Sequence, residues 1–164
     1  MSEDAKPQQR FQIQKLYIKD LSFEIPNAPQ VFQAFQKAWK PDINLQINTA
    51  NQQLDARSHE VVLSLTITAK QDEQTAFLIE LQQAGVFVLE NFSDQHLGPT
   101  LGAFCPSVLF PYARETVDSL LLKGGFPPLQ LAPVNFEALY LQRQRKQQQQ
   151  PSDSGQPAPD ATTH

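Results

Sequence analysis

Few side chains of this 164-residue chain could do covalent chemistry, and they lie far apart in the sequence. Cys105 is the single cysteine, and the histidines are His59, His96 and His164. A nucleophilic thiol needs a base that takes its proton, and only His96 is a plausible candidate for that base. Cys105 stands between Phe104 and Pro106, a setting typical of a small buried apolar residue rather than of a reactive thiolate. We therefore expect no catalytic site and no enzyme activity.

Metal ions and cofactors are not expected either. No histidine or cysteine pair has the spacing of a zinc site, and no phosphate-binding glycine motif occurs in the sequence. The acidic pairs Asp72-Glu73 and Asp20/Glu24 are explained by solvated surface charge. A lone cysteine cannot form an intramolecular disulfide, which fits a reducing compartment.

Charge and hydropathy narrow the class of protein. A formal net charge of -4 argues against nucleic-acid binding, which needs clustered lysine and arginine side chains. No stretch approaches the roughly 18 apolar residues of a membrane span, and the opening residues carry no basic segment or apolar core of a secretion signal. We expect a cytosolic protein with no nucleic-acid partner and no direct insertion into a membrane.

The chain has room for one domain, which we place at residues 11–142. Residues 1–10 are expected to form a flexible N-terminus. Residues 143–164 are expected to form a disordered polar tail, because the final segment, PSDSGQPAPDATTH, cannot bury enough apolar area to offset the cost of ordering.

Alternating apolar residues predict four strands, at 11–25, 43–48, 61–69 and 75–90. Polar residues 49–58 continue or close the second strand, and Gln71-Asp72-Glu73-Gln74 forms a short turn. Strands joined by such short connections pair antiparallel, because a parallel neighbour needs a long crossover. In the first strand, the side predicted to face the core is Phe11, Ile13, Tyr17, Leu21, Phe23 and Ile25.

Three helices and one loop complete the expected elements. A short helix starts near Asn27 and ends before Pro41, and residues 91–106, with their glycines and proline, are expected to form a long surface connection. A second helix begins near Leu109, with Pro111 in its first turn, and ends at Gly124-Gly125. Asn135 caps the last helix.

Two segments, LGAFCPSVLFPYARE and GGFPPLQLAPVNFEALY, closely resemble the C-terminal half of the SecB family of bacterial protein-export chaperones. The likeness continues upstream through FQIQKLYIKDLSFEIPNAP and TAFLIELQQAGVF, so it covers roughly residues 11–142. It implies an α+β fold, a four-stranded antiparallel sheet with helices packed on one face. It also implies a homotetramer, a dimer of dimers with helices sandwiched between the dimers, that holds unfolded precursor proteins without ATP and delivers them to the export ATPase SecA.

The resemblance also assigns two sets of site residues. The family's acidic SecA-binding patch corresponds here to Asp20, Glu24, Leu78 and Glu80. The two-residue period places Asp20 with Glu24 on one face of a strand, and Leu78 with Glu80 on one face of another. Positions near the family's contact between dimers correspond to Ile79, Leu81 and Gln83.

For client proteins we expect an apolar groove, because the apolar side chains are too numerous for the interior of one small two-layer domain. The side chains expected to line it are Trp39, Ile43, Leu45, Ile47, Leu97 and Leu101. Each of them could instead belong to the core.

Two other classes remain open. One is an export-independent chaperone on the same fold, for example one associated with a toxin–antitoxin pair, which would lack the acidic patch. The other is a small-molecule enzyme. The tail also departs from the family, because Arg143, Arg145 and Lys146 stand where a more acidic end is expected, which puts an auxiliary tail contact with the ATPase in doubt.

Overall fold

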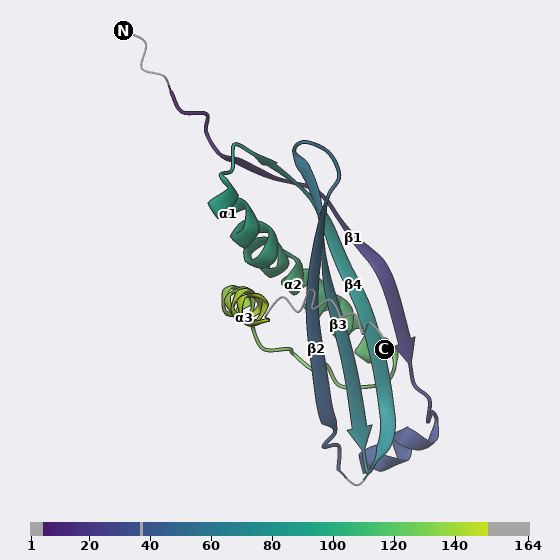
Figure 1. Ribbon diagram of the computed structural model, residues 1–164. Helices are drawn as coiled ribbons and strands as arrows, with labels where there is room; N and C mark the ends of the chain where they lie inside the picture. Colours follow the sequence, from purple (N-terminus) through teal and green to yellow (C-terminus); the bar gives the residue numbers. More distant parts are fainter. Residues whose placement is uncertain (1–4, 37, 151–164) are drawn as a thin grey trace, which may run out of the picture.

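A computed structural model of the chain describes residues 5–36 and 38–150, without the side chains of residues 34–36. Four strands come first, interrupted by a short 3-10 helix, and a run of helices follows (Figure 1). The strands are β1 Arg10–Glu24, β2 Asp42–Gln53, β3 Ser58–Gln71 and β4 Gln74–Glu90. The helical elements are η1 Gln30–Gln36, α1 Asp94–Pro99, η2 Thr100–Phe104, α2 Cys105–Lys123 and α3 Phe136–Gln149.

The strands form one antiparallel sheet in the order β1-β4-β3-β2, as the short connections predict. The turn between β3 and β4 consists of Asp72 and Glu73, whose φ angles are 50° and 63°. Two successive positive φ angles are typical of the tight hairpin turns that match the twist of paired strands. Because β1 and β2 lie at the edges, each leaves one side of its backbone without a strand partner within the described part of the chain.

Two β-bulges in β1 change which of its side chains face the core. The register with β4 shifts between Ile13 and Lys15 and again between Ile18 and Asp20. Leu16 and Ile18 therefore lie on the helix-covered face, whereas Tyr17 lies on the other face. The sequence expectation for Tyr17 was wrong, because each bulge inserts one residue and reverses the alternation that follows it.

The segment predicted as a long loop is helical. Residues 94–104 form α1 and the π-helical η2, and α2 continues directly from Cys105. Pro111 consequently lies inside α2 and not in its first turn. The expectation of a loop was wrong because it rested on Gly98, Pro99 and Gly102, and glycine and proline weaken a helix without excluding it.

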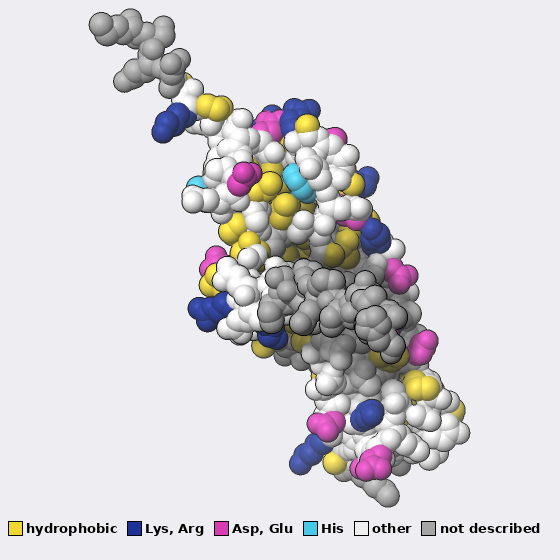
Figure 2. Space-filling model, viewed as in Figure 1, with side chains coloured by type: hydrophobic (Ala, Val, Ile, Leu, Met, Phe, Trp, Pro, Cys, Tyr) yellow, Lys and Arg dark blue, Asp and Glu magenta, His cyan; other side chains and the backbone are white. Residues whose placement is uncertain are grey.

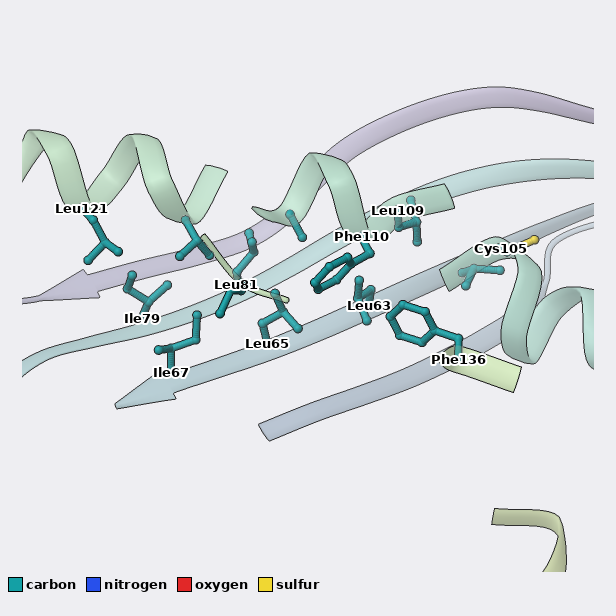
Figure 3. Packing of buried hydrophobic residues seen from close by; sticks show 14 of the residues in the cluster. Leu63, Leu65, Ile67, Ile79, Leu81, Cys105, Leu109, Phe110, Leu121 and Phe136 are labelled. Atoms are coloured by element: carbon teal, nitrogen blue, oxygen red, sulfur yellow. The ribbon is translucent and has the colours of Figure 1, made fainter. Parts of the chain in front are cut away.

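The core residues labelled in Figure 3 lie between one face of the sheet and the helices. Leu63, Leu65 and Ile67 of β3, with Ile79 and Leu81 of β4, meet Leu109, Phe110 and Leu121 of α2. Every one of these residues comes from odd-numbered strand positions or from the inner side of α2. The predicted fold, with helices packed on one face of a four-stranded sheet, is confirmed.

Helix α2 ends at Gly124 and Gly125 as predicted. Gly125 has a φ of 82°, its N–H donates to the carbonyl of Leu122, and the N–H of Phe126 donates to the carbonyl of Leu121 at 2.8 Å. This pair of hydrogen bonds is the Schellman motif, which satisfies carbonyl groups at a helix end. It turns the chain so that the Phe126 ring packs against Phe77, 5.0 Å between centroids.

Helix α3 also begins as predicted, since the side chain of Asn135 accepts a hydrogen bond from the N–H of Ala138 at 3.0 Å. Its end differs, because the helix runs to Gln149, seven residues beyond the expected domain boundary at 142. The remainder of the expected tail, residues 151–164, and residues 1–4 of the expected N-terminal segment lie outside the described residues.

Candidate functional site

The sheet face opposite the helices, here called the open face, brings the predicted acidic residues together. Glu24 of β1 lies directly opposite Leu78 of β4, Ser22 lies opposite Glu80, and Asp20 lies opposite Gln82. Asp20 and Glu24 are therefore both diagonal neighbours of Glu80, a separation of about 7–8 Å between α-carbons. All three carboxylates are exposed and Leu78 is half-buried. We call Asp20, Glu24, Leu78 and Glu80 the acidic patch.

No positive side chain neutralises this patch within residues 5–36 and 38–150. The ion pairs of that part of the chain are Arg10 with Glu90, Lys19 with Glu60 and Arg57 with Glu90. The acidic patch is thus a negatively charged surface with an apolar side chain in it, which suits a positively charged partner that also has an apolar contact.

On the same face, Glu60 of β3 is the centre of a polar cluster; it lies opposite Val86, four positions along β4 from the partner of Asp20. The Tyr17 hydroxyl and the Gln52 amide donate to its carboxylate, and the Lys19 ammonium lies 2.7 Å from Oε1. The hydrogen bonds from Lys19 and Tyr17 hold the pKa of Glu60 below its usual range. Burial and the neighbouring carboxylate raise the pKa of Tyr17 to about 12, so the phenol remains a neutral donor. No sequence pattern indicated this cluster, because its members come from three different strands.

The predicted client residues lie along the edge strand β2. Ile43 and Leu45 are 38% and 36% exposed on the helix-covered side of the sheet, and Ile47 is partly buried against the core. Trp39 precedes the strand, and its ring packs at 5.6 Å from the Phe126 ring. Since β2 rises about 3.3 Å per residue, Ile43 to Ile47 form an apolar strip roughly 13 Å long. We call Ile43, Leu45 and Ile47, with Trp39 at one end, the client strip.

The helices border the end of β2 that lies away from Trp39. On the face seen in Figure 2, hydrophobic side chains gather between α1 and the upper part of the sheet. Leu97 of α1 is partly buried against the core, whereas Leu101 of η2 is only 6% exposed and belongs to the core, so Leu101 is not available to line a groove. Helix α3 crosses to β2, where the Arg143 guanidinium donates to the Thr49 hydroxyl at 2.5 Å.

The residues predicted to contact another dimer are buried inside the subunit. Ile79, Leu81 and Gln83 are 0%, 1% and 4% exposed and lie on the face that the helices cover. The prediction that these side chains contact another copy directly is therefore wrong, because they are not accessible in the folded subunit. Helix α2 packs on β4 over this face.

Several exposed apolar side chains of the helices were not identified from the sequence. They are Phe104, Tyr112, Leu122 and Leu141. Phe104 and Leu141 border a pocket of about 380 Å³ between η2 and α3, which also includes Ala103, Glu137 and Tyr140. The i, i+4, i+8 spacing of Phe104, Val108 and Tyr112 is the signal that could have revealed this surface, had residues 91–106 been assigned to a helix.

Within the part of the chain that the structure describes, the side chains able to do chemistry do not form a site. Cys105 is fully buried, and burial raises the pKa of its thiol to about 12. His96 is exposed and near Ser93 and Gln9. Within the described ranges no group of three or more metal-ligating side chains comes together, and no helix there is long and apolar enough to cross a membrane.

Comparison with known proteins adds family information to this geometry. The family model described as preprotein translocase subunit SecB matches residues 4–148. The protein-export protein SecB of Nitrosococcus oceani is 54% identical over 156 residues, which cover 90% of this chain and 94% of the relative. That of Hahella chejuensis is 55% identical over 152 residues, covering 92% of this chain and 94% of the relative.

A solved structure agrees in fold. The SecB-like chaperone of Mycobacterium tuberculosis, in complex with a ChAD peptide from an antitoxin, matches with a TM-score of 0.63 and 21% identity. The match covers 76% of this chain and 91% of that one. From the family match and the identity to its members over most of their length, the chain belongs to the SecB family of protein-export proteins.

Proposed function

We propose that the chain is an ATP-independent holdase chaperone of the cytosol. It binds unfolded precursor proteins, keeps them competent for translocation and delivers them to the export ATPase SecA. Membership of the SecB family supports this class of function. The observation that carries the mechanism is the exposure of the apolar side chains of Ile43 and Leu45 on the helix-covered face of the edge strand β2.

Exposed apolar strips suit a partner that is unfolded and variable in sequence. Apolar contacts are non-directional, so they favour any client segment that brings aliphatic or aromatic side chains. At about 25 cal/mol per Å², a few such contacts give modest affinity per subunit after the client's ordering cost. Four copies in one assembly would raise avidity for a long client without a chemical energy source.

The first experiment measures whether the purified chain holds clients. We expect it to suppress the aggregation of a denatured precursor, followed by light scattering, without added nucleotide. The control is a cytosolic enzyme without a signal segment, kept in its native state. The chain should not bind this folded protein. Equal scattering with and without the chain would contradict the proposal.

For delivery, we propose that the acidic patch binds SecA. The exposed carboxylates Asp20, Glu24 and Glu80 lie together on the open face, away from the client strip, so both partners could bind at once. The double charge reversal Asp20→Lys with Glu80→Lys should weaken SecA binding and leave client binding intact. Glu73→Lys, in the exposed turn after β3, is the matched control, and unchanged SecA binding of the double variant would contradict this docking site.

For assembly, we propose a homotetramer built as a dimer of dimers, with the outer side of α2 covered by another copy. Tyr112 and Leu122 on that side are 50% and 64% exposed. Two such exposed large apolar side chains on one helix favour a surface that another subunit covers. No cofactor, metal ion or catalytic step is part of the proposal.

The export-independent alternative predicts the same fold and client strip but no SecA docking. The unneutralised acidic patch favours the export role, because a chaperone dedicated to one other partner has no need of it. Binding of SecA to the wild-type chain separates the two functions.

A further inference from the structure

The second β-bulge of β1 places a positive charge next to the acidic patch. Ile18 pairs with Gln83 and Asp20 with Gln82, so Lys19 is the extra residue between them. Its ammonium reaches Glu60, which lies on the open face, so Lys19 and Asp20, adjacent in the chain, both present their side chains to that face. Without another partner, Lys19 would be the cation best placed to pair with Asp20.

Glu60 holds that cation away from the patch. The Lys19 ammonium lies 2.7 Å from the Glu60 carboxylate, towards β3, and Tyr17 and Gln52 complete the set of donors. Glu60 is only 8% exposed, and its lowered pKa keeps it charged at neutral pH. A buried carboxylate that loses its cation is costly, so the pair with Lys19 is favoured over a pair between Lys19 and a fully solvated carboxylate.

We infer that Glu60 is a positioning residue for the partner surface: by binding Lys19 it preserves the full negative charge of the acidic patch for a positively charged segment of SecA. This inference rests on the proposed docking of SecA at the patch. It assigns to Glu60 a role beyond stability, because the consequence of losing it is a new positive charge beside Asp20.

Removing the negative charge of Glu60 releases Lys19. In Glu60→Gln the amide oxygen still accepts from Tyr17, but the ammonium has no carboxylate on β3 and can turn towards Asp20, the next residue in the chain. Neutralising one exposed carboxylate of an interface changes affinity modestly, so we expect SecA to bind about two- to five-fold more weakly at low salt. The difference should shrink at high salt, because exposed charges are screened.

The experiment compares full-length variants for their dissociation constants with SecA at low and high salt. Glu60→Gln should bind more weakly, and adding Lys19→Gln should restore wild-type affinity, since the released cation is then absent. Adding Lys15→Gln instead is the matched control. Lys15 pairs with Val86, four positions along β4 from the partner of Asp20 and so about 13 Å away, and its loss should not restore binding.

Lys19→Gln alone keeps the test decisive if Glu60→Gln does not fold. Because Lys19 is already held by Glu60, this variant should bind SecA as the wild type does. Tighter binding by Lys19→Gln, or unchanged binding by a folded Glu60→Gln, would overturn the role of Glu60. Failure of the docking site itself is distinguishable, since charge reversal at Asp20 and Glu80 would then leave SecA binding unchanged as well.

Discussion

Burial decides the chemistry of the titratable side chains. Cys105 has no exposed surface, and the pKa of its thiol is raised to about 12 by burial. At pH 8 the native chain should therefore react with a thiol reagent at least about a hundred-fold more slowly than the chain in denaturant, because the thiolate is scarce and inaccessible. Equal rates in the two states would contradict the burial of Cys105.

Glu60 shows the opposite effect, and it predicts a pH dependence of stability. Its pKa is lowered in the folded state, chiefly by the hydrogen bonds from Lys19 and Tyr17. The resulting stabilisation is present above the unfolded pKa of about 4.3 and is lost as the pH falls through the lower folded pKa. Because the Lys19 side chain is 41% exposed, the contribution is modest, about 1–2 kcal/mol.

The check is thermal unfolding of wild type and Glu60→Gln from pH 7 to pH 3. Glu60→Gln should be less stable at pH 7, and the gap should close as the pH falls below about 4. Tyr17→Phe, which removes one hydrogen bond but no charge, should lower stability without abolishing the acid dependence. A gap of constant size over this range would contradict the assignment.

Among the elements, α3 depends on two glycines of the preceding helical layer. A methyl group added at Gly102 would meet the Tyr140 ring at 2.4 Å, whereas one at Gly98 would meet only the Tyr140 hydroxyl, at 2.8 Å. Tyr140 therefore packs on a surface that only glycine leaves free, and this contact joins α3 to η2.

Gly102→Ala should displace Tyr140 and loosen α3. We expect a loss of stability of about 1–3 kcal/mol, typical of overpacking, and faster amide exchange over residues 136–149. Gly98→Ala is the matched control with a smaller effect, because only the end of the tyrosine side chain must move. Tyr140→Leu in the Gly102→Ala background should recover part of the loss, and no recovery would argue against a direct clash.

Sequence patterns predicted elements well where local rules decide the structure. The hairpin turn at Asp72-Glu73, the cap at Asn135 and the glycine end of α2 were all correct, because each depends on a few adjacent residues. The bulges of β1 and the helix over residues 94–104 were missed. The alternation of apolar and polar residues does not reveal where a bulge lies. Gly98 and Gly102 look like helix breakers in the sequence, because the residue that packs on them, Tyr140, comes about forty residues later.

For the candidate site residues too, the sequence predicted the face of the sheet but not the burial of each side chain. Strand parity correctly grouped the acidic patch on one face, since Asp20, Glu24, Leu78 and Glu80 follow the second bulge or lie on regular β4. Leu101 was expected in a loop that lines the client groove, and the family resemblance assigned Ile79 and Leu81 to the contact between dimers, but all three side chains are buried. The burial of a side chain depends on tertiary packing, and the residue pattern within one strand carries no information about that packing.

For the whole molecule, the outer side of α2 is the surface on which the proposed assembly depends. Tyr112→Lys with Leu122→Lys should shift the native mass from tetramer towards dimer, because two charges would have to be buried at the contact. Leu54→Lys is the matched control, since Leu54 is similarly exposed in the turn after β2. An unchanged tetramer in the double variant would place the contact between dimers elsewhere.

The most direct test of the account measures client affinity at the client strip. The double variant Ile43→Ser with Leu45→Ser, shown to keep the wild-type oligomer, should bind an unfolded precursor about ten-fold more weakly, because two half-exposed apolar contacts are lost. Leu54 follows the end of β2, about 30 Å along the strand from Leu45. The control variant Leu54→Ser should therefore bind the unfolded precursor as the wild type does. Unchanged affinity of the double variant would contradict the claim that this strip holds clients.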